Sequence, residues 1–166
     1  MEIVYALIII TVVCAICIGY YIYALDTHIV RVPKGQVMEF KTSMELTGLP
    51  IITFYQGKES YNFLLDTGSN VSYVNEASAL EVTKTGIKDV FVGAEGKDID
   101  CEKAHIKLYR NTLEYECEVS LANLEVAFGE IKNCYGVPLS GILGNDFFTK
   151  YKYCLDFKEL VAYIRK

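Results

Sequence analysis

The chain of 166 residues has little of what several classes of binding site require. It contains only two histidines, and its cysteines do not supply a pair of CxxC motifs, so we expect no zinc site. Its net charge is −5 and no basic patch is interleaved with aromatic residues, which argues against a nucleic-acid partner. It has neither an internal repeat nor a low-complexity tract. We therefore expect a function that needs no metal, no cofactor and no nucleic acid.

Charged residues are absent from the run between Ile3 and Leu25, which is long and apolar enough for a helix to cross a bilayer core. A cleaved signal peptide is the alternative, but it requires a shorter run with a cation before it, and Glu2 is the only charge there. The far end of the run carries tyrosines, as an interfacial aromatic belt does: Tyr20, Tyr21 and Tyr23. We predict an N-terminal transmembrane helix within residues 1–25.

Cations and cysteines bear on the compartment of the remaining chain. No cation precedes the apolar run, and three follow it within the distance over which the positive-inside bias is counted: Arg31, Lys34 and Lys41. This asymmetry favours a single-pass protein whose larger part is cytoplasmic. Two disulfides are arithmetically possible among the later cysteines, but we expect reduced core thiols at Cys101, Cys117, Cys134 and Cys154.

Residues 26–35 are predicted to be a short juxtamembrane connector, and residues 36–166 a single, mostly β domain. Side chains alternate over residues 37–42 as in a half-buried strand. Gly57 to Ser60 separates two apolar runs as a hairpin loop does, and the second run leads to Asp66. Similar patterns predict strands at Pro50 to Gln56, Asp89 to Val92, Ile99 to Tyr109, Leu113 to Ser120, Tyr153 to Phe157 and Leu160 to Ile164.

Two short helical segments are predicted within this domain. One is a single turn over Glu76 to Glu81, with Asn75 as its N-cap. The other follows Gly144, where Asn145 or Asp146 is placed to cap a helix whose apolar face includes Phe147 and Phe148.

An apolar strand ends abruptly at Asp66-Thr67-Gly68-Ser69. A carboxylate at such a strand end, beside a glycine, invites a functional interpretation. The structural alternative is an Asx-turn, in which Gly68 supplies backbone freedom. A second element, Ile142-Leu143-Gly144, lies later in the chain, just before the predicted helix. The occurrence of both elements in one short domain favours the functional interpretation.

These two motifs resemble those of the retropepsin-like aspartic proteases, single-domain relatives of the retroviral enzymes, and the resemblance extends from about Thr47 to Lys166. It implies a closed β-barrel with a flap hairpin and one short C-terminal helix. It also implies that the two motifs thread into a ψ-shaped crossing. The catalytic loop is then Asp66, Thr67 and Gly68, and the residues that support this loop are Ser69, Ile142, Leu143 and Gly144.

The chain has a single Asp-Thr-Gly, so the resemblance implies a homodimer with one Asp66 from each subunit. Two neighbouring carboxylates cannot both ionise at ordinary cost, and the pair therefore holds one proton. The ionised carboxylate then activates a water while the protonated one donates to the scissile carbonyl. The resemblance also implies that Thr67 braces the two loops by hydrogen bonds across the dimer. We expect the Ser69 hydroxyl to hydrogen-bond the carboxylate and to shift the rate profile towards acid.

Three further assignments depend on this resemblance. A flap over the substrate is expected at Gly93, Ala94, Glu95 and Gly96, with an ordinary hairpin turn as the alternative. The strand from Leu160 to Ile164 either interleaves at the dimer interface or completes its own subunit. A glycan at the sequon Asn70-Val71-Ser72 would obstruct the neighbouring catalytic loop, which agrees with a cytoplasmic domain.

The expected function is that of a membrane-anchored aspartic endopeptidase acting on peptides or proteins. The alternative is an inactive module of the same fold that dimerises or binds peptides, since a fold alone does not prove activity. The intact Asp66-Thr67-Gly68 argues against this alternative. A generic single-pass membrane protein with a β domain would require both motifs to arise by chance.

Overall fold

The structure is a computed structural model that describes residues 11, 13–21, 37–92 and 98–164. The chain divides into two units, Met1–Val32 and Pro33–Lys166. In the first unit, residue 11 and residues 13–21 are helical. The described part of the chain contains no helix that is both long and apolar enough to span a membrane. The rest of the predicted anchor, at residues 1–10, 12 and 22–25, and the predicted connector at residues 26–35 lie outside the described residues.

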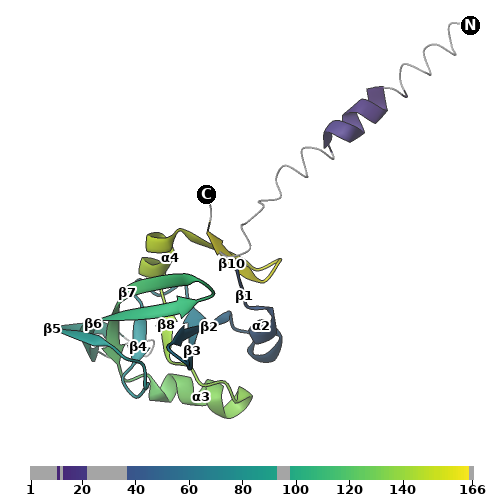
Figure 1. Cartoon of the computed structure of the whole chain (residues 1–166). Coiled ribbons are helices and arrows are strands. Elements are labelled where there is room, and N and C mark those ends of the chain that lie inside the picture. Colours follow the sequence, from purple (N-terminus) through teal and green to yellow (C-terminus); the bar gives the residue numbers. More distant parts are fainter. Residues whose placement is uncertain (1–10, 12, 22–36, 93–97, 165–166) are drawn as a thin grey trace, which may run out of the picture. The chain divides into compact units, whose positions relative to one another are not determined.

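The second unit is mostly β, as the alternating patterns predict (Figure 1). Its strands are β1 (Val37–Glu39), β2 (Ile51–Gln56), β3 (Glu59–Leu65), β4 (Tyr73–Asn75), β5 (Thr83–Val92), β6 (Asp98–Arg110), β7 (Leu113–Ala122), β8 (Gly141–Leu143), β9 (Tyr153–Asp156) and β10 (Val161–Ile164). Its helices are α2 (Lys41–Thr47), α3 (Glu125–Tyr135) and α4 (Asn145–Tyr151).

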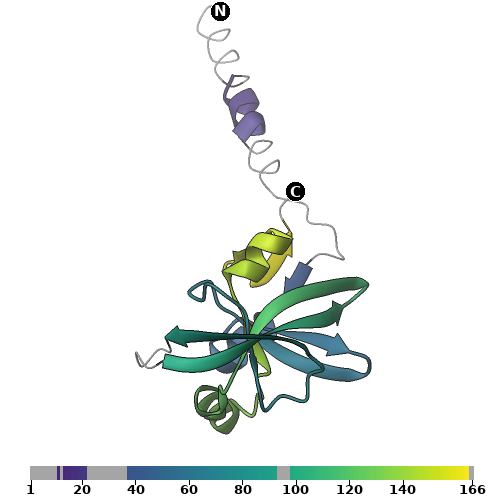
Figure 2. The ribbon, with the colours of Figure 1, turned by 90° about the vertical axis from the view of Figure 1, so that its left-hand side faces the viewer.

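Six strands close into a barrel, which confirms the predicted closed barrel. The larger sheet has the order β2-β3-β8-β4-β7-β6-β5, and an additional pairing between Tyr55 of β2 and Tyr109 of β6 joins the ring. β5 pairs with the outer edge of β6, and the β5–β6 hairpin projects beyond the barrel (Figure 2). Figure 1 shows α3 and α4 on opposite sides of the barrel.

Alternation along the strands fills the barrel with apolar side chains. In β3, Tyr61, Phe63 and Leu65 are buried, whereas the intervening Asn62 and Leu64 are only partly so. Aromatic rings meet edge to face inside the barrel, as between Phe54 and Phe63, whose centroids lie 5.8 Å apart. Burial of each such side chain stabilises the fold by about 1.5–3 kcal/mol relative to exposure, so the interior supplies the main driving force of folding.

A second, three-stranded sheet has the order β1-β10-β9. β10 is antiparallel to both neighbours, and Ala162 at its centre pairs with Met38 of β1 and Leu155 of β9. Both edges of β10 are therefore paired within its own chain. Of the two interpretations of Leu160 to Ile164, the structure supports the strand that completes its own subunit.

The strand predicted over residues 37–42 is correct only as far as Glu39, because α2 begins at Lys41. The helix is fixed by the Ser43 hydroxyl, which donates to the carbonyl oxygen of Phe40 at 2.9 Å and accepts from the backbone N–H of Ile51 at 2.9 Å. The alternation of side chains does not reveal these tertiary hydrogen bonds.

The helical turn predicted over Glu76 to Glu81 is also wrong, since Glu76 and Ala77 form a turn, Ser78 a bend, and residues 79–81 belong to no helix or strand. Asn75 does not cap a helix here. It is buried at the end of β4, and its side-chain oxygen accepts from the backbone N–H of Leu124 at 3.1 Å. The C-terminal helix is confirmed as α4, with Phe147 and Phe148 buried, but its N-cap is Gly144.

Candidate functional site

Asp66 follows the last residue of β3, and the chain leaves the barrel interior at this residue. Leu65 before it is 3% exposed, whereas Asp66 is partly exposed and both Thr67 and Gly68 are exposed. The backbone N–H of Asp66 donates to the carbonyl oxygen of Leu143 at 3.0 Å. One carboxylate oxygen, Oδ1, accepts from the backbone N–H of Gly68 at 2.9 Å. The carboxylate is thus held by its own loop and still reached by solvent.

The structure brings the two sequence motifs together. β8 lies between β3, to which it is parallel, and β4, to which it is antiparallel. Ile142 at its centre pairs with Leu64 on one side and Tyr73 on the other. Beyond the strands, the backbone N–H of Asn145 donates to the carbonyl oxygen of Ser69 at 2.8 Å. The loop that carries Asp66 and the segment 142–145 are therefore joined by backbone hydrogen bonds on both sides of the carboxylate.

Glycines occupy the points at which these segments approach most closely. A Cβ on Gly144 would lie 2.6 Å from the carbonyl oxygen of Val71 and 2.8 Å from that of Ser69. A Cβ on Gly141 would lie 2.3 Å from the carbonyl oxygen of Tyr73. At Gly68 it would lie 3.2 Å from Oδ1 of Asp66. The three contacts made by Gly141 and Gly144 are shorter than real Cβ atoms make, so the crossing requires glycine at positions 141 and 144.

Two polar residues at the start of α4 complete the loop, and the sequence indicated them only as candidate helix caps. The side-chain amide of Asn145 donates to the carbonyl oxygen of Thr67 at 2.9 Å. Asp146 accepts from the backbone N–H and the hydroxyl of Ser72, at 2.8 and 2.6 Å. Their position directly after Ile142-Leu143-Gly144 was the available signal.

The predicted hydrogen bond from the Ser69 hydroxyl to the Asp66 carboxylate is wrong. Its oxygen donates to the carbonyl oxygen of Val71 at 2.8 Å, so the single O–H of this side chain is used within the loop. The donor that reaches the Asp66 carboxylate is the backbone N–H of Gly68. Ser69 therefore shapes the loop without acting on the carboxylate.

Apolar side chains beside the crossing form a partly open surface. Leu64, Val71 and Ile142 are only partly buried, and they pack against a cluster on the outer face of the barrel that includes Tyr73 and Leu139. Burial raises the pKa of Tyr73, and the nearby Cys101 and Asp89 raise it further, so its phenol stays neutral at ordinary pH. A neutral, apolar wall of this kind suits uncharged side chains better than charged ones.

The predicted flap at Gly93 to Gly96 lies outside the described residues. The hairpin that leads to it is described, with Val92 of β5 paired with Asp98 of β6. The register of this hairpin shifts between Lys84 and Lys88, where Gly86 has a left-handed φ of 77°. The shift separates the base of the hairpin from its outer part.

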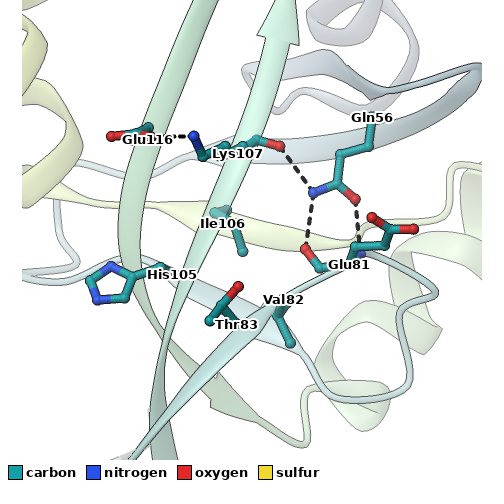
Figure 3. A pocket seen from close by; sticks show the side chains of 8 residues that line it. All are labelled: Gln56, Glu81, Val82, Thr83, His105, Ile106, Lys107 and Glu116. Carbon is teal, nitrogen blue, oxygen red and sulfur yellow. Dashed lines mark hydrogen bonds and ion pairs between the residues drawn. The ribbon is translucent and has the colours of Figure 1, made fainter.

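A pocket of about 390 Å³ lies at the base of this hairpin and contains no residue of the Asp66 loop (Figure 3). The side-chain amide of Gln56 fills one side: it donates to the carbonyl oxygens of Glu81 and Lys107, at 3.0 and 2.9 Å, and accepts from the backbone N–H of Glu81 at 2.8 Å. Gln56 thereby fastens the chain entering β5 to the barrel. We interpret this pocket as part of the attachment of β5 to the barrel.

Comparison with models of known protein families and with curated proteins gives no match for this chain.

Proposed function

We propose that this chain is a membrane-anchored aspartic endopeptidase of the retropepsin-like kind, active as a homodimer. The observation that carries the proposal is the position of Asp66, a partly exposed carboxylate at the end of a barrel strand, held by the Gly68 N–H at 2.9 Å. The parallel insertion of β8 beside β3 supports it, because this pairing fixes the loop on a rigid element.

The proposed reaction is hydrolysis of a peptide bond by a water activated between two Asp66 carboxylates. One carboxylate is ionised and takes a proton from the water as the water attacks the carbonyl carbon. The partner's Asp66 is protonated and donates to the carbonyl oxygen as negative charge develops there. No covalent bond forms between the enzyme and the substrate.

A second subunit is required because the chain supplies only half of this chemistry. The sequence contains one Asp-Thr-Gly. Asp146, which lies two residues after the second motif, accepts two hydrogen bonds from Ser72 and is unsuited to a proton-sharing role beside Asp66. A two-fold symmetric dimer brings two copies of Asp66 together, so the second carboxylate need not come from another residue of the chain.

The apolar run from Ile3 to Leu25 supports a membrane anchor, and the cations that follow it support a cytoplasmic position for the barrel. Anchoring confines the subunits to a surface and raises their effective concentration for pairing. Weak association in solution is therefore compatible with a dimer on the membrane.

The test is hydrolysis of peptide pools from acidic to neutral pH by the full chain in detergent micelles. The wild type is compared with Asp66→Asn, which keeps the shape of the side chain and removes its proton chemistry. We expect cleavage by the wild type and at least a ~1000-fold slower rate for the variant. Equal rates for the two proteins would overturn the proposal.

A further inference from the structure

The carboxylate of Asp146, near the start of α4, binds both polar groups of Ser72. Its Oδ1 accepts from the Ser72 hydroxyl at 2.6 Å, and its Oδ2 accepts from the Ser72 backbone N–H at 2.8 Å. Oδ1 also accepts from the backbone N–H of Phe147 at 2.7 Å. Ser72 is 1% exposed. Hydrogen bonds to a carboxylate are shorter and stronger than neutral ones, so this contact is a firm connection between α4 and the start of β4.

Ser72 extends this connection to the glycine of the second motif. Its hydroxyl oxygen accepts from the backbone N–H of Gly144 at 3.0 Å while its O–H points to Asp146. Gly144, Ser72 and Asp146 therefore form a chain of hydrogen bonds at the far end of the loop 66–72. The near end is held by the bond from the Asp66 N–H to the carbonyl oxygen of Leu143.

We infer that Asp146 and Ser72 are positioning residues, which set the direction of the Asp66 carboxylate by fixing the far end of its loop. This inference rests on the proposed function. Neither side chain contacts Asp66 in the described structure; each acts through the loop and through β8. Catalysis depends on such fixed geometry, because a displacement of about 1 Å at a reacting group costs on the order of 100-fold in rate.

Two variants interrupt the connection at different atoms. Asp146→Asn keeps the size of the side chain, but one oxygen becomes an NH2 group, which meets the backbone N–H of Ser72 or of Phe147 donor to donor in either orientation of the amide. Ser72→Ala removes the hydroxyl and leaves the Gly144 N–H without its acceptor. If both side chains act through one connection, the double variant loses no more activity than the more impaired of the two single variants.

Matched controls lie elsewhere in the fold. The Asp156 carboxylate accepts from the backbone N–H groups of Lys158 and Glu159, at 2.9 and 3.0 Å, in the turn between β9 and β10. The Ser43 hydroxyl accepts from the Ile51 N–H. Asp156→Asn and Ser43→Ala therefore break bonds of the same chemistry outside the Asp66 loop.

The experiment measures peptide hydrolysis and backbone hydrogen exchange on the full chain in detergent micelles, at a temperature where circular dichroism shows each variant folded. We expect Asp146→Asn and Ser72→Ala to lower kcat by about 10-fold or more, with KM within about two-fold of the wild type. Exchange is expected to quicken in peptides covering residues 66–72 and 141–147, and neither control is expected to produce this pattern.

A kcat equal to that of the wild type in both folded variants would overturn the positioning role and leave the proposed function intact. An equal fall in kcat for the two controls would also overturn it, because the loss would then reflect general destabilisation. Absence of Asp66-dependent cleavage in the wild type would overturn the proposed function, and this inference with it.

Discussion

The side-chain amide of Asn145 donates a hydrogen bond of 2.9 Å to the backbone carbonyl oxygen of Thr67. Asn145 also donates its backbone N–H to the carbonyl oxygen of Ser69 at 2.8 Å. One residue of α4 thus holds the loop on both sides of Gly68, whose N–H reaches the Asp66 carboxylate. The orientation of the carboxylate depends on a helix that lies about 80 residues further along the chain.

Replacing Asn145 by Asp tests this dependence. The variant exchanges the amide donor for a carboxylate oxygen that faces the Thr67 carbonyl oxygen. We expect kcat/KM to fall by about 10-fold, which corresponds to about 1.4 kcal/mol, the upper range for one hydrogen bond. Asn133→Asp adds the same charge at an exposed position of α3 and is the control. If both variants lose activity equally, net charge is the cause and the hydrogen bond is irrelevant.

Alanine at Gly144 is expected to destabilise the fold. Its Cβ would lie 2.6 Å from the Val71 carbonyl oxygen, a backbone atom that cannot move without opening the crossing. We expect a loss of at least about 2 kcal/mol in the free energy of unfolding, measured by urea denaturation. Gly129→Ala is the matched control, since a Cβ there meets nothing within 4 Å. In the interior of α3 it should stabilise by about 0.5–1 kcal/mol.

Strands were predictable from this sequence where their side chains alternate, as in Pro50 to Gln56, which the structure gives as β2. Predictions from alternation were wrong where a tertiary contact decided the local conformation. α2 begins inside an alternating pattern because Ser43 bonds to the start of β2. α3 was missed because Gly129 and Asn133 weaken its helical signal, although Gly136 ends it with a left-handed φ of 70°.

The two motifs of the candidate site could be predicted from the sequence, but the hydrogen bonds that connect them could not. Asp66 and Ile142 to Gly144 are recognisable in sequence because together they resemble the paired motifs of a known protease family. Ser72 and Asp146 are common residues, and the insertion of β8 between β3 and β4 brings them within 2.6 Å of each other. Sequence spacing carries no information on which of several hydroxyls will face a given carboxylate, so the partner of Ser69 was also assigned wrongly.

Ser69→Ala is expected to leave the acidic limb of the pH–rate profile unchanged. The Ser69 O–H donates to the Val71 carbonyl oxygen, so its removal takes no hydrogen bond from Asp66. We expect a loss of about 0.5–1.5 kcal/mol in the free energy of unfolding, the usual cost of one hydrogen bond. The measurement is kcat/KM from acidic to neutral pH for both proteins. A displaced acidic limb would mean that the hydroxyl turns to the carboxylate in the active enzyme.

The buried thiol of Cys117 should make the fold sensitive to alkaline pH. Burial raises the pKa of this thiol from 9.0 to about 12, so the folded state keeps the proton that the unfolded state loses. Its contribution to stability is complete below pH 9 and is lost as the pH rises towards 12. The free energy of unfolding should therefore fall by up to about 1.4 kcal/mol per pH unit in that window.

Urea denaturation of the wild type and of Cys117→Ala at several values between about pH 8 and pH 10 measures this slope. The variant is expected to be less stable at every pH because it leaves a cavity, but its stability should fall less steeply with pH. Cys134→Ala removes an exposed thiol and should keep the slope of the wild type. Equal slopes for Cys117→Ala and the wild type would show that ionisation of other groups accounts for the alkaline loss.

Mixing wild-type and Asp66→Asn chains tests whether one active site needs two subunits. When equal amounts are produced together and purified as dimers, random pairing leaves about a quarter of the dimers with two intact carboxylates. Activity per chain should therefore fall to about a quarter of the wild-type value, because a carboxylate and an amide cannot share the proton that the reaction moves. A site complete within one chain would instead retain about half. Varying the ratio sharpens the distinction, since a two-chain site gives activity that follows the square of the wild-type fraction and a one-chain site gives a straight line.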